Sequence, residues 1–174
     1  MPIPGSLPAA TAIAADGTFQ VRGIRDGEHR LQMNVPGFYV TSIKYGKAEI
    51  LGMPFKYSGR ASEEIEVTLR DSTATASGKV TDETMLPVSG VNVVFIPVDG
   101  SRLELFRTVP TDQNGHYKLT NLAPGEYKAF SWESIDSNAY FDPEFLKKYE
   151  PLGKSIVVSE STNSTVDLKL ILAQ

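Results

Sequence analysis

The stretch Thr111–Phe130, TDQNGHYKLTNLAPGEYKAF, decides the fold of this chain. It opens with turn-forming residues at 112–115, after which apolar and polar residues alternate from Tyr117 onward. A Pro-Gly turn follows at Pro124, and a second alternation begins at Tyr127. The pattern predicts two short antiparallel strands joined by a tight turn, which is a β-hairpin.

The same unit occurs earlier in the chain. Residues 16–33, DGTFQVRGIRDGEHRLQM, align without a gap with residues 114–131, at a separation of 98 residues. The matched pairs are Gly17 and Gly115, Phe19 and Tyr117, Val21 and Leu119, Ile24 and Leu122, Gly27 and Gly125, and His29 and Tyr127. Residues 64–69 also match residues 165–170, at a separation of 101. A period of about 100 residues indicates one small domain per copy and is too long for a solenoid repeat.

Four motifs of the second copy resemble a known family. They are GKVTD at 78–82, LPVSGVNV at 86–93, TDQNGHY at 111–117 and LAPGEY at 122–127. They resemble the carboxypeptidase regulatory-like domain, a transthyretin-like seven-stranded Greek-key β-sandwich that is also similar to Cna B-type domains. The resemblance covers residues 75–172 and, more weakly, residues 10–70. It implies an all-β chain of two tandem transthyretin-like Greek-key β-sandwiches, at 1–71 and 72–174, the second with one short helix.

The first domain lacks counterparts of the opening strands. Residues 75–98, which hold the first two strands of the second copy, would align with positions before residue 1. Residues 1–15 contain prolines at positions 2, 4 and 8, which disfavour a central strand. Three explanations stay open: a chain cut inside a domain, a smaller domain that closes differently, or a gap filled by a strand from another chain. The last predicts self-association through unpaired edge strands of the first domain.

Alternation and turn residues place the remaining elements. Strands are predicted within 35–46 and at 47–51, 63–70, 76–81, 91–97, 102–109, 154–158 and 165–172. One short helix is predicted to start with Asp142 as N-cap and Pro143 at its first position, and to end before Pro151.

Composition excludes several classes of function. The formal net charge of −4 comes from the second domain, and lysine and arginine form no cluster of the kind that binds nucleic acid. The chain contains no cysteine, which removes disulfides and thiolate metal sites. No apolar run is long enough for a membrane span. We expect an extracellular, cell-surface or periplasmic location, with the signal peptide outside this chain.

Residues with catalytic or metal-binding chemistry are dispersed. His29 takes the inward place of Tyr127 and His116 points outward, so neither predicts a metal site. Asp112 and Asn114 begin like a calcium loop, but their turn-forming role explains them better. Some Cna B-type domains join a lysine to an Asn or Asp by an isopeptide bond; the alternation turns Lys79 and Asp167 outward here, which disfavours it. We therefore predict no catalytic residue, no metal and no cofactor.

The best candidate surface is aromatic. Phe130 and Trp132 lie on the face of their strand opposite to the core, and more rings follow in the helical segment. The candidate contact residues are Phe130, Trp132, Tyr140, Phe141 and Tyr149. Exposed rings could bind a polysaccharide or a protein partner, or the segment could fold back so that the rings form a second small core. The favoured function is a noncatalytic adhesive or spacer module of an exported bacterial protein; the alternative is a carbohydrate-binding module accessory to a secreted enzyme or outer-membrane receptor.

Overall fold

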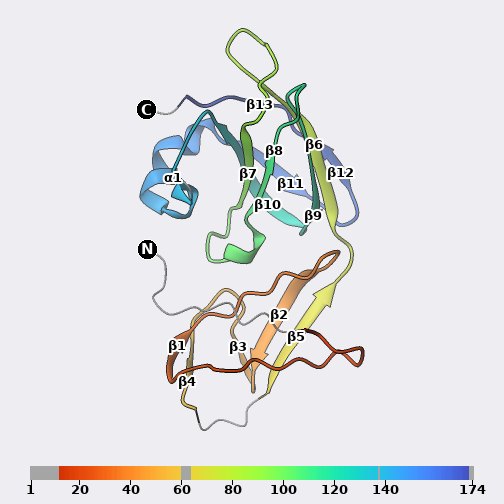
Figure 1. The fold of residues 1–174 in the computed structure, drawn as a ribbon, viewed down its shortest axis with the longest axis vertical. Coiled ribbons are helices and arrows are strands. Elements are labelled where there is room, and N and C mark those ends of the chain that lie inside the picture. Colours follow the sequence, from red (N-terminus) through yellow and green to blue (C-terminus); the bar gives the residue numbers. More distant parts are fainter. Residues whose placement is uncertain (1–11, 60–63, 137, 173–174) are drawn as a thin grey trace.

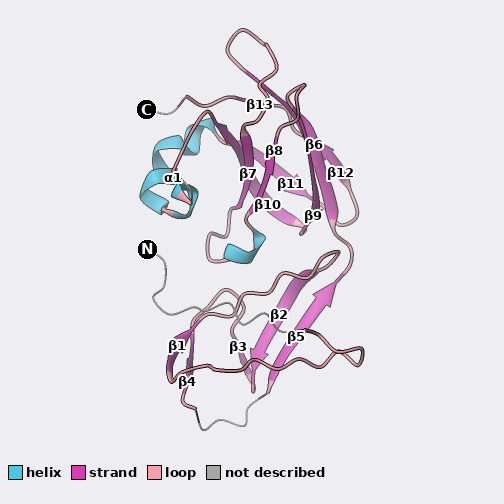
Figure 2. Ribbon diagram, in the orientation of Figure 1, coloured by secondary structure: helices cyan, strands magenta, loops and turns pink. Residues whose placement is uncertain are grey.

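The computed structural model describes residues 12–59, 64–136 and 138–172. Within these ranges the chain is built mainly from β-strands with a single short α-helix, as predicted (Figure 2). Strands β1–β5 pair with one another, strands β6–β13 pair with one another, and no described strand pair joins the two groups (Figure 1). This pairing supports the proposed division near residue 71. None of the described helices is long and apolar enough to cross a membrane. Residues 1–11, whose prolines disfavour a central strand, lie outside the described residues.

The second group forms a β-sandwich. Its elements are β6 (Ala74–Thr81), β7 (Asn92–Pro97), η1 (Leu103–Leu105), β8 (Arg107–Pro110), β9 (His116–Leu122), β10 (Gly125–Trp132), η2 (Ala139–Phe141), α1 (Pro143–Tyr149), η3 (Glu150–Leu152), β11 (Lys154–Val158), β12 (Asn163–Thr165) and β13 (Leu168–Lys169). One sheet has the strand order β11-β10-β7-β8, and in the other β6 pairs with β9, β12 and β13. Apolar side chains from both sheets, such as Phe95 and Leu122, fill the space between them.

The hairpin predicted within 111–130 is wrong. β9 pairs with β6, whereas β10 pairs with β7 and β11, so the chain crosses from one sheet to the other at Ala123–Pro124. The phenol of Tyr127 donates a hydrogen bond to the Ala123 carbonyl at 2.9 Å and holds this crossover. Burial raises the pKa of Tyr127 to about 12, because the charged form would lose its hydration.

The last predicted strand is also interrupted. β12 and β13 both run parallel to β6, and between them the carbonyl of Val166 approaches the backbone of Gly78 so closely that a Cβ at residue 78 would overlap it. Tyr117 donates its hydroxyl proton to this carbonyl, and the carboxylate of Asp167 accepts a hydrogen bond from the Lys79 amide at 3.0 Å. At the interruption, the Asp167 carboxylate therefore accepts the hydrogen bond of the Lys79 amide in place of a backbone carbonyl.

The first group is smaller. Its strands are β1 (Gly27–His29), β2 (Tyr39–Tyr45), β3 (Ala48–Glu49), β4 (Phe55–Tyr57) and β5 (Ile65–Arg70). β1 pairs with β4, and a separate sheet has the order β3-β2-β5. Val40, Ile43, Ile50 and Phe55 form its buried core.

The backbone of residues 14–27 repeats that of residues 112–125. The Ala14 amide bonds to the Thr18 carbonyl and the Gly17 amide to the Ala14 carbonyl, and the same two bonds join Asp112 with His116 and Gly115 with Asp112. Positive φ angles recur at the aligned positions: +84° and +74° at Gly17 and Gly115, +74° and +58° at Gly23 and Asn121, and +143° and +150° at Gly27 and Gly125. Gly27 also pairs with Tyr57 as Gly125 pairs with Val158. These matches support a repeated unit.

The two copies differ in burial. The inward residues Phe19, Val21 and Ile24 are only half-buried, whereas their counterparts Tyr117, Leu119 and Leu122 are 4%, 6% and 0% exposed. In the second copy these side chains face the sheet that contains β7 and β10. Among the described residues, β1–β5 include no counterparts of β6–β8.

We predict that Gly78→Ala destabilises the chain by about 3 kcal/mol, because the added methyl group must displace the backbone of residue 166. Urea unfolding would measure the effect. Gly100→Ala is the matched control, since a Cβ there meets nothing within 4 Å, and it should change the free energy of unfolding by less than about 0.5 kcal/mol. Equal stability of the two variants would contradict the close approach at Gly78.

Candidate functional site

The outer face of β10 is covered by the segment that follows it. Asp142 accepts a hydrogen bond from the Glu144 amide at 2.9 Å, and Pro143 occupies the first turn, so α1 begins where the sequence predicts. The helix places Phe145 and Tyr149 against Trp132, with ring centroids 5.9 and 5.8 Å away. Figure 1 shows α1 beside the β7–β10 sheet.

The five predicted contact residues lie in one region but differ in exposure. Phe130 and Trp132 are each 3% exposed and stack at 4.9 Å with an 8° angle between their rings. Tyr149 is 9% exposed, Tyr140 is half-buried, and Phe141 is 41% exposed. Three of the five rings are therefore buried. They form a second small core with Val94, Ile96 and Ile171, which is the second of the two interpretations of this pattern given above.

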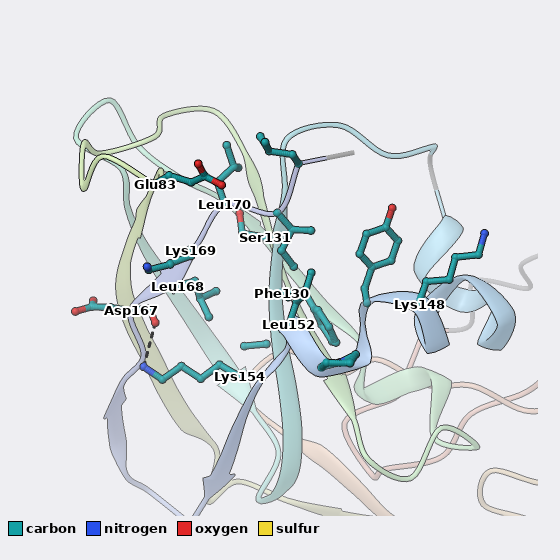
Figure 3. Close-up of a pocket in the computed structure, with 15 residues that line it drawn as sticks. Glu83, Phe130, Ser131, Lys148, Leu152, Lys154, Asp167, Leu168, Lys169 and Leu170 are labelled. Atoms are coloured by element: carbon teal, nitrogen blue, oxygen red, sulfur yellow. Dashed lines mark hydrogen bonds between the residues drawn. The ribbon is translucent and has the colours of Figure 1, made fainter. Parts of the chain in front are cut away.

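A pocket opens beside this second core, where β10 changes neighbours. Ala129 pairs with Lys154 of β11, and three residues later Trp132 forms a bridge with Ile171 of the C-terminal segment. Between these two pairings lies a pocket with a volume of about 810 Å³, whose lining includes Phe130 and Ser131 (Figure 3). Two of the predicted residues, Phe130 and Tyr149, therefore line a pocket, although neither presents an exposed ring face.

Charged side chains surround the pocket. Its lining includes three lysines, Lys148, Lys154 and Lys169, and two acidic residues, Glu83 and Asp167. The Lys154 ammonium donates a hydrogen bond to the Asp167 carbonyl at 3.0 Å, which ties β11 to the opposite sheet. In Figure 3 the carboxylate of Asp167 points away from the pocket. It accepts a hydrogen bond from the backbone amide of Lys79.

An ion pair anchors the helical segment beside the pocket. The Lys128 ammonium lies 2.8 Å from the Glu150 carboxylate at the end of α1. The hydrogen bond from Lys128, together with its charge, lowers the pKa of Glu150. This pair connects β10 to the segment that covers its outer face.

The other sequence candidates have structural roles. His29 bonds to the Arg25 carbonyl at 2.7 Å and is half-buried, while His116 is exposed. Asp112 accepts hydrogen bonds from the Asn114 and His116 amides at 2.8 and 2.9 Å, which is the turn role predicted for it. In the described ranges, His, Cys, Asp and Glu side chains do not gather in groups of three that could hold a metal ion.

Sequence reasoning missed the pocket residues of the C-terminal segment. The strand predicted at 165–172 includes Leu170, Ile171 and Leu172, but Ile171 instead bridges to β10. The sequence signal here is the alternation itself, which does not reveal that the chain leaves β6 after Leu170 and bonds to β10 at Ile171.

We predict that Trp132, the single tryptophan, emits at short wavelength and resists quenching by acrylamide, because its ring is 97% buried between Phe130 and α1. Unfolding in urea should shift the emission to longer wavelength and restore quenching. Native fluorescence that is quenched as strongly as that of free tryptophan would show that the helical segment does not cover β10.

Comparison with known proteins finds a family match within the second strand group. Residues 75–131 match the carboxypeptidase regulatory-like domain. A search of curated proteins finds no match.

Similar solved structures include three bacterial proteins. A proposed carbohydrate-binding protein of Pseudomonas aeruginosa is 15% identical over 56% of this chain and 88% of its own, with a TM-score of 0.39. The Bacillus anthracis TIE protein is 12% identical over 76% of this chain and 24% of its own, with a TM-score of 0.39. The major pilin subunit of Bacillus cereus is 17% identical over 63% and 31%, with a TM-score of 0.37. These similarities are too distant to assign a function. The family match confirms, over residues 75–131, the resemblance to the carboxypeptidase regulatory-like domain found in the sequence.

Proposed function

We propose that the chain is a noncatalytic structural and interaction module of an exported bacterial protein, acting as a spacer or adhesive part of a larger molecule. This proposal is carried by one observation: a short linker and several hydrogen bonds join the two strand groups. β5 ends at Arg70 and β6 begins at Ala74, so only three residues connect them. A connection this short restricts the relative movement of the parts it joins.

Polar contacts reinforce the junction on one side. Arg102 donates a hydrogen bond from Nη2 to the Val40 carbonyl at 2.9 Å, and Arg30 donates from Nη1 to the Ser101 carbonyl at 3.1 Å. Glu104, whose side chain is 7% exposed, forms an ion pair with Arg102 and orients its guanidinium. A hydrogen bond from a charged donor is worth about 1.5–3 kcal/mol.

A second set of contacts lies near the linker. The hydroxyl of Tyr39 donates to the Glu160 carboxylate at 3.1 Å, and Arg70 lies 3.4 Å from the same carboxylate. Because the side chains of Arg70 and Glu160 are 61% and 52% exposed, their ion pair contributes about 0–1 kcal/mol. Two separate sets of contacts oppose hinge motion better than one, which suits a spacer.

The carbohydrate-binding alternative has less support. It needs a row of exposed ring faces, and of the five candidates only Phe141 is exposed, at 41%, while its neighbour Tyr140 is half-buried. Phe141 also stacks on Phe106 at 4.8 Å, which occupies one of its faces.

Self-association is a second candidate role, favoured by the half-buried row Phe19, Val21 and Ile24. A strand supplied by a second copy would bury this row as the second domain buries its own. We predict that light scattering detects dimers at high concentration, that Val21→Glu abolishes them, and that Arg22→Glu on the outward side of the same segment does not. A strictly monomeric chain would rule this role out.

We predict that the double variant Arg102→Ala, Glu104→Gln loosens the junction, because it removes the charged donor to Val40 without leaving a buried carboxylate unpaired. NMR relaxation should report one common tumbling time for both strand groups in the native chain and two different times in the variant. Arg70→Ala, which removes only an exposed ion pair, is the control and should behave like the native chain. Independent tumbling in the native chain would contradict the spacer role.

A further inference from the structure

One edge of β5 lacks the neighbour that its counterpart has in the second domain. Residues 64–69 align with residues 165–170, and in the second domain β12 and β13 both run parallel to β6. In the first strand group β5 pairs with β2 and stands at the end of its sheet (Figure 1). Among the described residues, no strand pairs with the other side of β5, which we call the open edge of β5. An edge of this kind offers unpaired backbone groups to another strand.

Hydrogen bonds to the β2 side show which backbone groups face the open edge. The Glu64 carbonyl accepts a bond from the Gly46 amide, and the Thr68 carbonyl accepts one from the Thr41 hydroxyl at 3.2 Å. Because successive residues of a strand direct their backbone groups to opposite sides, those of 65, 67 and 69 face away from β2. No hydrogen bond joins these three amides to a described residue outside β2.

The same backbone positions bond to β6 in the second domain. The Val166 amide donates to the Ser77 carbonyl and the Leu170 amide to the Thr81 carbonyl, both at 2.8 Å. At the separation of 101, their aligned residues are two of the three whose amides face the open edge. β5 therefore presents donors at the positions that a parallel strand uses in the other copy.

The second neighbour of β6 also has an unpaired counterpart. β6 pairs with β9 on its other side. The segment aligned with β9, residues 18–24, forms no described strand, and its apolar row Phe19, Val21 and Ile24 is only half-buried. A strand in the place of β6 would therefore have two segments to pair with, as β6 has.

The sequence of β6 indicates what such a strand must contain. Ala74, Ala76 and Val80 turn into the core, so the inward side carries small and β-branched apolar residues. The residues between them include a threonine, a serine and an exposed lysine. An added strand needs the same alternation, because one of its sides faces the apolar row and the other faces solvent.

Charge beside the open edge favours a lysine in the added strand. In the second domain Lys79 lies beside Asp167, whose carboxylate accepts its amide hydrogen bond. The residue of β5 aligned with Asp167 is Glu66. Its side chain is 69% exposed, and its ion pair with Lys44 is 3.7 Å long. A second lysine can therefore approach this carboxylate from the open edge.

We propose that the open edge of β5 binds an extended segment of a partner protein, which adds as a strand parallel to β5. The segment alternates small or β-branched apolar residues with polar ones and places a lysine beside Glu66. Backbone hydrogen bonds hold the segment, and the alternation fixes which of its sides faces the core. The inference rests on the interaction role proposed above and names the chemistry of the partner.

The test is an NMR titration of the isotope-labelled full chain with a peptide that has the sequence of β6, acetyl-Ala-Thr-Ala-Ser-Gly-Lys-Val-Thr-amide. The peptide should shift the amide signals of residues 18–24 and 64–70. At saturation it should slow hydrogen exchange of the amides of 65, 67 and 69 at least about tenfold, because these amides become bonded. The control is the same peptide with its lysine backbone nitrogen methylated, which removes one donor toward β5 and should abolish these changes.

The direction of the added strand can be measured separately. A nitroxide label on the N-terminus of the peptide should broaden the signals of 64–66 more than those of 69–71. A label on the C-terminus should reverse this order. An antiparallel strand would give the opposite result with both labels.

A matched pair of variants tests the charge contact. Glu66→Lys should weaken binding of the peptide about threefold, the size of one exposed charge contact, and added salt should remove the difference. Glu28→Lys makes the same charge change at an exposed residue of β1 and should leave the affinity unaltered.

The inference is wrong if the peptide leaves the β5 amides unchanged, if the methylated peptide binds equally well, or if the labels indicate an antiparallel strand. Protection of the same amides at high protein concentration without peptide would assign the open edge to a second copy and would also overturn it. The spacer role is decided separately, by the tumbling times of the two strand groups.

Discussion

The double burial of β10 is the constraint on which the rest of the second domain depends. Tyr127 and Ala129 face the sandwich core, and Phe130 and Trp132 face the aromatic cluster on the other side. A strand buried on both faces needs two covering layers, so the sheet of β6 and β9 must close over one face and the α1 segment over the other. The pocket follows from the same arrangement, because it opens where β10 passes from β11 to the C-terminal segment.

In the first copy, the segment aligned with β10 is not buried on both faces. At the positions aligned with Phe130 and Trp132 it has Gln32 and Asn34, both exposed, so its outer face needs no cover. Its segment 35–54 forms the β2–β3 strands in place of a helix that folds back. The turn hydrogen bonds recur in both copies, while the outer face changes. Together these observations support two copies of one fold whose outer faces are covered differently.

Local signals in the sequence predicted local structure well. The cap at Asp142 and the proline at 143 predicted α1, and alternation predicted which side of β10 each residue faces. The sequence could not predict that β9 and β10 lie in different sheets, because a Pro-Gly turn between alternating strands suits both a hairpin and a crossover. The choice depends on the distant partners β6 and β7. Burial of Trp132 likewise depends on how residues 133–153 dock, and no local pattern encodes that docking.

Amide hydrogen exchange tests the central claim most directly. If β10 is the strand that both layers cover, the amides of residues 127–132 exchange only when the second domain unfolds globally, and those of the aligned residues 29–34 exchange at least about 100-fold faster. Equal protection of the two segments, or exchange of the β10 amides before those of β5 and β11, would contradict the account.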